Sequence, residues 1–235
     1  MAGIQIQGAT GSVVEVGGFA AKGLHTINKP HDYGAFGHYR GIFTTGTIAA
    51  GMAANGELLQ MRWVDATRFC IITHVAVLEF RNITTAFAAG VFNFALTRAT
   101  AWTADGTGGG AVTVTDPAFQ LRAATMGASL FSTGFRLATT AALGAGTKTL
   151  DGNNMGMSFG NVGSTPAIAD YIIPKGGGTG PASGYGVDLF QPDTGAGEHP
   201  IGLAQNEGVV VRATVPATGT WIASMLVKWI EVSAF

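Results

Sequence analysis

The amino-acid sequence predicts an all-β protein, an antiparallel β-sandwich or jelly-roll-like domain that carries an extended N-terminal arm. Short runs rich in Val, Ile, Thr and Phe recur along the chain, and glycine-rich turns separate them. No segment repeats apolar residues at the i, i+3, i+4, i+7 spacing of an amphipathic helix. Many strands without intervening helices favour two packed antiparallel sheets. We therefore expect an arm over residues 1–40 and one sandwich domain over residues 41–235.

The arm is predicted because glycines interrupt every periodic run in the first 40 residues. The segment is nevertheless too apolar for a free tail, since Ile, Val, Leu, Phe and Tyr recur through it. An extended segment that docks on another subunit fits both facts. We expect its larger apolar side chains to form an assembly interface, namely Phe19, Leu24, Tyr33, Phe36 and Tyr39.

The strongest strand signals lie in the middle of the chain and near its C-terminus. Residues 87–98 place Phe92, Phe94 and Leu96 on one face, which is the period-two pattern of a strand. Residues 208–215 and 221–232 flank the sequence Pro-Ala-Thr-Gly-Thr, which predicts an antiparallel hairpin. Further strands are expected at residues 41–50, 57–64, 68–81, 111–115, 119–121, 130–137 and 185–190.

The glycine-rich stretch around residues 150–184 is expected to be a long insertion in the domain. Loops of this length are usually functional or packed against a neighbour. The insertion contains Gly-Met-Ser-Phe-Gly at residues 156–160, which matches the nucleophile-elbow pattern of serine hydrolases, with His199 later in the chain. That motif needs a helix directly after Ser158. The Gly, Ser, Thr and Pro of residues 161–166 do not permit one, so we expect no enzyme.

Charged residues are unusually scarce. They make up 11% of the chain, and the formal net charge is −1, where about 25% charged residues is typical of soluble domains. We expect other subunits to cover part of this weakly charged surface, in a homo-oligomer and most simply a trimer. The balance of charges excludes nucleic-acid or membrane partners that are held by bulk positive charge. The hydrophobic content of 47% excludes disorder.

The only cysteine, Cys70, permits no intrachain disulfide and fits synthesis in a reducing cytoplasm. The first residues lack the basic and apolar regions of a secretory signal, so we expect no export. The uncharged stretches are too short and too polar to predict a membrane-spanning helix.

Two groups of side chains could bind a ligand. His25, His31 and His38 carry a metal-ligating group, but their spacing matches no compact ligand pattern, which leaves ion binding open. We expect them to be hydrogen-bonding partners at a subunit contact, and we expect no metal or other cofactor. Among the aromatic residues, Trp102 and Tyr185 are candidates for stacking on a sugar, whereas core packing is expected for tryptophans such as Trp221.

Residues 37–77 (GHYRGIFTTG and onward) and 201–232 (IGLAQNEGVV and onward) together resemble β-rich virion structural proteins of tailed bacteriophages. The likeness covers the middle and the C-terminus of the chain and includes no catalytic motif. It implies a protein that is made in the host cytoplasm and functions in the virion.

This resemblance implies a non-enzymatic decoration or cement protein. Such a protein would bind the major capsid protein from outside and stabilise the junctions between capsomers. One alternative is a host-glycan-binding spike or fibre module that uses Trp102 and Tyr185. A second alternative is a structural component of the tail or baseplate.

Overall fold

The computed structural model describes residues 37–49, 52, 54–114, 119, 127–131, 134–162, 186–192 and 198–233, together with the backbone of two short strands nearer the N-terminus. This part of the chain contains no α-helix, and its strands form antiparallel sheets, so the all-β prediction is confirmed. Accordingly, no helix among the described residues is long and apolar enough to cross a membrane.

The strands are β1 (Gln5–Gln7), β2 (Val13–Glu15), β3 (His38–Thr44), β4 (Gly56–Trp63), β5 (Phe69–Asn82), β6 (Gly90–Ala104), β7 (Gly110–Ala111), β8 (Phe135–Leu137), β9 (Thr147–Leu150), β10 (Gly156–Val162), β11 (Val187–Phe190), β12 (Ile201–Leu203), β13 (Glu207–Thr214) and β14 (Trp221–Val232).

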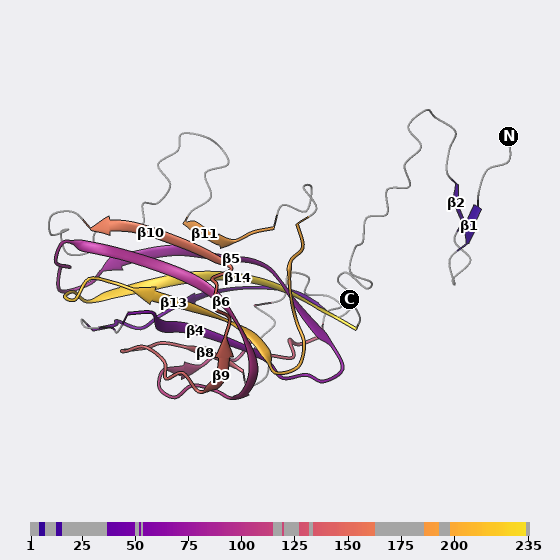
Figure 1. Ribbon diagram of the computed structural model, residues 1–235, viewed down its shortest axis with the longest axis horizontal. Helices are drawn as coiled ribbons and strands as arrows, with labels where there is room; N and C mark the ends of the chain where they lie inside the picture. Colours follow the sequence, from indigo (N-terminus) through magenta and orange to yellow (C-terminus); the bar gives the residue numbers. More distant parts are fainter. Residues whose placement is uncertain are drawn as a thin grey trace.

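Two sheets build the sandwich. The larger has the order β10-β6-β13-β4-β8-β7, with β9 also paired to β6, and Figure 1 shows the first four of these strands following one another across the molecule. The smaller has the order β11-β5-β14-β3, with β12 also paired to β5. Among the described strands, β1 and β2 pair with each other and with no other strand. Because β3 begins at His38, the sandwich starts inside the stretch that we assigned to the arm.

The core lies between the two sheets and is rich in aromatic rings. Phe92, Phe94 and Leu96 all point into it, as the alternation in β6 predicted. Trp221 and Trp229 are also buried there. β14 alternates strictly, because every second residue from Trp221 to Trp229 faces the core. The two register shifts against β14 each leave one extra residue on β5, so bulges keep the apolar side of β5 inward, at Phe80, Val77, Val75 and Ile72.

The prediction of a hairpin around residues 216–220 is wrong. Both flanking segments are strands, but β13 pairs with β4 and β6 in one sheet, whereas β14 pairs with β3 and β5 in the other. Each strand is central in its own sheet and already has two partners. The Pro-Ala-Thr-Gly-Thr loop therefore crosses from one sheet to the other.

This crossing loop is bonded to a second crossing, the β5–β6 connection. The Ile83 N–H donates to the Thr220 carbonyl at 2.8 Å, and the Thr220 N–H donates to the Thr85 carbonyl at 2.9 Å. The Thr220 hydroxyl oxygen accepts from the N–H groups of Thr84 and Thr85. Two inter-sheet connections that are far apart in sequence thus hold each other at one end of the sandwich.

The stretch expected to be an insertion contributes a strand, β10, to the larger sheet. The two glycines of β10 lie where neighbouring atoms approach the backbone closely. A Cβ on Gly156 would lie 1.5 Å from the Leu189 carbonyl oxygen, and one on Gly160 would lie 2.7 Å from the Phe92 ring. Gly156 thereby brings β10 against β11 at the common edge of the two sheets. Residues 163–185 of the same stretch lie outside the described residues.

Candidate functional site

Of the five residues expected at an assembly interface, the structure describes one. Tyr39 lies in β3, where Tyr39, Gly41 and Phe43 face inward by strand alternation. Its fully buried ring stacks on Trp229 with the ring centroids 5.4 Å apart, and its hydroxyl donates to the Gly127 carbonyl at 2.8 Å. Assigning Tyr39 to an interface is therefore wrong, because the side chain is part of the core. Phe19, Leu24, Tyr33 and Phe36 lie outside the described residues.

The sugar-stacking role expected for Trp102 is also wrong. Its side chain is fully buried, and its indole Nε1–H donates to the Ala104 carbonyl at 3.0 Å. The ammonium of Lys148 lies 4.7 Å from the ring centroid, on the face that a sugar would need. Tyr185 lies outside the described residues.

Ser158 lies in the middle of β10, paired antiparallel opposite Phe94 of β6. The strand continues to Val162, so the strand-to-helix turn of a nucleophile elbow does not form at this serine. Asp188 bonds to His74 at 2.7 Å, and His199 lines a surface pocket beside Leu189.

The histidine region is described only at His38. Burial, and next the charge of Lys228, lower the pKa of this imidazole below its usual value. His25 and His31 lie outside the described residues. The described part of the chain contains no group of three side chains suited to hold a metal ion.

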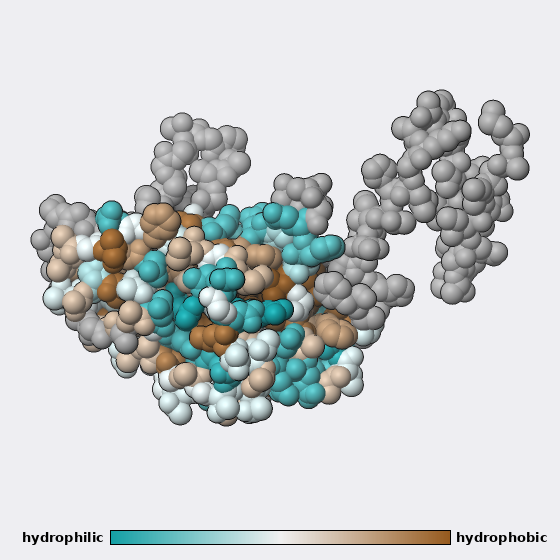
Figure 2. Space-filling view, in the orientation of Figure 1, coloured by the Kyte–Doolittle hydropathy of each residue, from teal (hydrophilic) through white to brown (hydrophobic). Residues whose placement is uncertain are grey.

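An exposed apolar surface lies at the β10 edge of the larger sheet. Its outward-facing members are Val91, 65% exposed, Met157, 54% exposed, and Phe159, 78% exposed. The register places Phe159 opposite Asn93 and Met157 opposite Ala95, so these side chains share one face with Val91. Met155, just before the strand, is 43% exposed. We call these four residues the β10 surface, and Figure 2 shows apolar residues over the part of the sandwich where β10 ends in Figure 1.

The position of β10 favours association through this surface. β10 is the terminal strand of its sheet, and β6 is its ladder partner among the described strands. An edge strand with a large apolar outer face is a template for contact with another chain. The sequence did not reveal this surface, because glycines made residues 156–162 resemble a loop.

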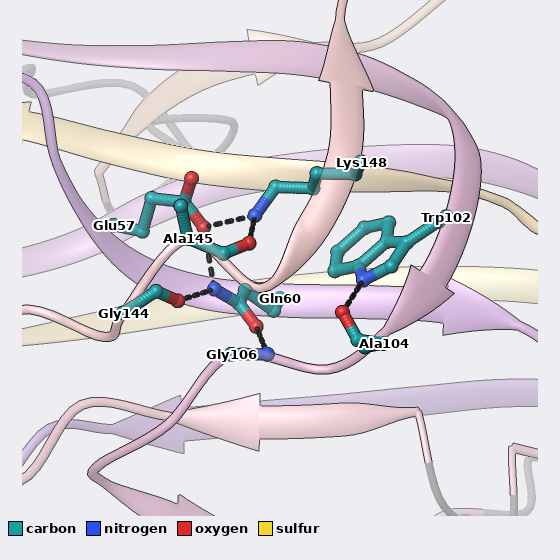
Figure 3. Close-up of polar contacts among 8 residues, drawn as sticks. All are labelled: Glu57, Gln60, Trp102, Ala104, Gly106, Gly144, Ala145 and Lys148. Atoms are coloured by element: carbon teal, nitrogen blue, oxygen red, sulfur yellow. Dashed lines mark hydrogen bonds and ion pairs between the residues drawn. The ribbon is translucent and has the colours of Figure 1, made fainter.

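A second feature that sequence analysis missed is a buried polar cluster of Glu57, Gln60 and Lys148, shown in Figure 3. The Lys148 ammonium donates to Glu57 Oε2 at 2.8 Å, and the Gln60 amide Nε2 donates to the same oxygen at 2.5 Å. The Lys148 and Glu57 side chains are only 2% and 8% exposed. Lys148 is far from the other two in sequence, so no local spacing could indicate that they meet.

A third buried group is the carboxyl of Glu231, which is fully buried near the end of β14. Its Oε1 accepts hydrogen bonds from the Ser129 hydroxyl at 2.7 Å, the Leu130 N–H at 3.0 Å and the Trp229 indole N–H at 3.3 Å. Burial raises the pKa of Glu231, and these hydrogen bonds offset the rise only in part. The carboxyl fastens residues 127–131 to β14.

The raised pKa of Glu231 predicts a pH dependence of stability. The folded protein binds this proton more tightly than the unfolded chain, so the stabilisation is complete below the ordinary pKa of 4.5 and is lost as the pH rises through the raised value. We expect the free energy of unfolding of the wild type to fall, relative to Glu231→Gln, as the pH rises above about 4. Denaturant titrations of both proteins at several pH values measure this change. A wild type whose free energy of unfolding rises with pH relative to that of Glu231→Gln would contradict the assignment.

No protein-family model, curated protein or solved structure matches this chain. The inference of function therefore depends on the surfaces and contacts described above.

Proposed function

We propose that the protein is a structural component of a tailed-bacteriophage virion, a decoration protein that binds the capsid exterior and stabilises capsomer junctions as a homotrimer. The observation that supports this most is the β10 surface, an apolar face on a sheet edge that is 78% exposed at Phe159. Exposed apolar patches of this kind mark protein contacts. In this proposal the protein is made in the host cytoplasm and acts in the virion without enzymatic chemistry.

A second copy of this chain is the occupant we assign to the β10 surface. With a net charge of −1, copies repel one another weakly. Obligate interfaces are large and more hydrophobic than transient ones, which suits a chain with 11% charged residues. Contact with the major capsid protein is then assigned to other parts of the trimer.

Replacing Phe159 with aspartate should dissociate the oligomer. A charge placed in the centre of an apolar interface costs about 2 kcal/mol or more, so we expect the dissociation constant to rise at least about tenfold. Sedimentation across a concentration series measures it.

The matched control is Ile42→Asp. Ile42 is also an exposed apolar strand residue, 54% exposed, but it lies on β3 of the smaller sheet. The control should leave the oligomer mass unchanged. A wild type that sediments as a monomer at every concentration would contradict the proposal, and so would a Phe159→Asp protein that keeps the wild-type mass.

The location in the particle separates the decoration role from the alternatives. Electron microscopy of virions that carry a labelled copy of this chain should place the label on the capsid exterior. A label on the tail or baseplate would favour the second alternative. In the glycan-binding alternative Trp102 cannot stack on a sugar, because its ring is buried.

A further inference from the structure

The Glu57–Gln60–Lys148 cluster holds the three groups that amide exchange requires, namely an amine, a carboxamide and a carboxylate between them. We propose that Lys148 and Gln60 form an intramolecular isopeptide bond, with Glu57 transferring the protons, so that β4 is covalently joined to β9. This inference is independent of the role proposed above, because it concerns the interior of a single chain.

The first argument is the shared oxygen. Glu57 Oε2 accepts from the Lys148 ammonium, which is the source of the nucleophile, and from Gln60 Nε2, which would be the leaving nitrogen. One carboxylate oxygen can therefore take a proton from the attacking amine and deliver one to the departing nitrogen, as a general base and then a general acid.

The second argument is the state of the carboxamide. The backbone N–H of Gly106 donates to Gln60 Oε1 at 3.0 Å, while Gln60 Nε2 also donates to the Gly144 carbonyl at 2.8 Å (Figure 3). A fixed donor on the carbonyl oxygen stabilises the negative charge that develops there when an amine attacks. A Cβ at position 106 would lie 2.6 Å from Gln60 Nε2 and 1.9 Å from the Gly144 oxygen, so this close approach depends on glycine.

The third argument is confinement. Gln60 is fully buried, and the Lys148 side chain is fixed by the Ala145 carbonyl and by the face of the Trp102 ring. Lys148 Nζ and Gln60 Nε2 both bond to Glu57 Oε2, at 2.8 and 2.5 Å, so folding already meets the entropic cost of bringing the two groups together. Exclusion of water also protects the carboxamide from hydrolysis, which is the competing reaction.

The proposed reaction balances without an external reagent. Glu57 takes a proton from the Lys148 ammonium, and the amine electron pair forms a bond from Nζ to Cδ of Gln60, which places negative charge on Oε1. Glu57 then gives its proton to Nε2, the Cδ–Nε2 bond breaks with its electron pair on nitrogen, and ammonia leaves. The remaining extra proton on Nζ passes through Glu57 to the ammonia. The products are a secondary amide and an ammonium ion.

Intact mass spectrometry of the purified full-length chain tests the proposal. The expected mass is lower than that of the sequence by one ammonia molecule, and a protease digest should contain a branched peptide joined between Gln60 and Lys148. A chain at the full sequence mass, also after prolonged incubation, would overturn the proposal. Loss of one water with a branch at Glu57 would overturn it too, because Glu57 would then be the acyl group rather than the proton carrier.

Three variants sharpen this result. Glu57→Gln and Lys148→Arg should both restore the full mass, whereas Lys228→Arg, which changes a lysine of β14, should keep the loss of ammonia. Asn55 precedes Gly56, and succinimide formation at such a pair also releases ammonia. That reaction would persist in Lys148→Arg, so ammonia loss in this variant together with a wild type that has no Gln60–Lys148 branched peptide would overturn the assignment. The branched peptide of the wild type decides the question even if a variant does not fold.

Discussion

Replacing Phe80 with alanine is expected to lower the free energy of unfolding by about 3–5 kcal/mol. Phe80 lies in β5 and is fully buried. Its ring centroid lies 5.4 Å from that of Phe87, 5.2 Å from those of Phe92 and Phe94, and 5.3 Å from that of Trp221. These partners belong to both sheets and to a connection between them, so a cavity here removes contacts that no single strand can move to refill.

Chemical denaturation monitored by tryptophan fluorescence measures this loss. Ile42→Ala is the control, since Ile42 is 54% exposed and a surface truncation changes stability by about 0.5 kcal/mol or less. If Phe80→Ala were as stable as this control, the ring cluster would not be the centre of the core.

Replacing Glu231 with alanine is expected to cost about 3 kcal/mol or more. The change leaves the Ser129 hydroxyl and the Leu130 N–H without their acceptor, and a buried unsatisfied donor costs about 1–3 kcal/mol. The Trp229 indole N–H loses one of its two acceptors and keeps the Ser129 hydroxyl. The variant should also expose residues 127–131, since the carboxyl fastens them to β14. Hydrogen exchange of the Leu130 amide reports this local opening separately from global stability.

Glu231→Gln is the companion variant, because it keeps one acceptor oxygen and removes the charge. It should be more stable than Glu231→Ala. Equal stability of the alanine variant and the wild type would show that these hydrogen bonds contribute nothing net to folding.

The fold class was predictable because runs rich in Val, Ile, Thr and Phe separated by glycine-rich turns mark strands, even though long strands such as β4 and β14 are buried on both faces. In β6 the alternation of Phe92, Phe94 and Leu96 identified both the strand and its inner face. Alternation does not identify partners, however. The β13 and β14 segments resemble a hairpin because they are adjacent in sequence and separated by turn residues. In the structure they belong to different sheets, and each lies between two strands of its own sheet.

The functional features were not predictable for related reasons. Tyr39 was assigned to the arm because Gly34 and Gly37 interrupt the periodic pattern before it. The alternation of buried and exposed residues along β3 nevertheless places its ring in the core. The β10 strand was hidden by Gly156 and Gly160, which are present because backbone and ring atoms approach closely. Glu57 and Lys148 meet only after β9 has paired with β6, and such a contact leaves no local sequence pattern.

The alternation of successive strands between the two sheets bears on how the molecule unfolds. β3, β4, β5 and β6 pass from one sheet to the other at each step, and so do β13 and β14. Neither layer can separate alone, because each of these linkers joins one of its strands to a strand of the other layer. Melting should therefore be a single cooperative transition, and refolding should be slow, since almost every ladder joins residues distant along the backbone.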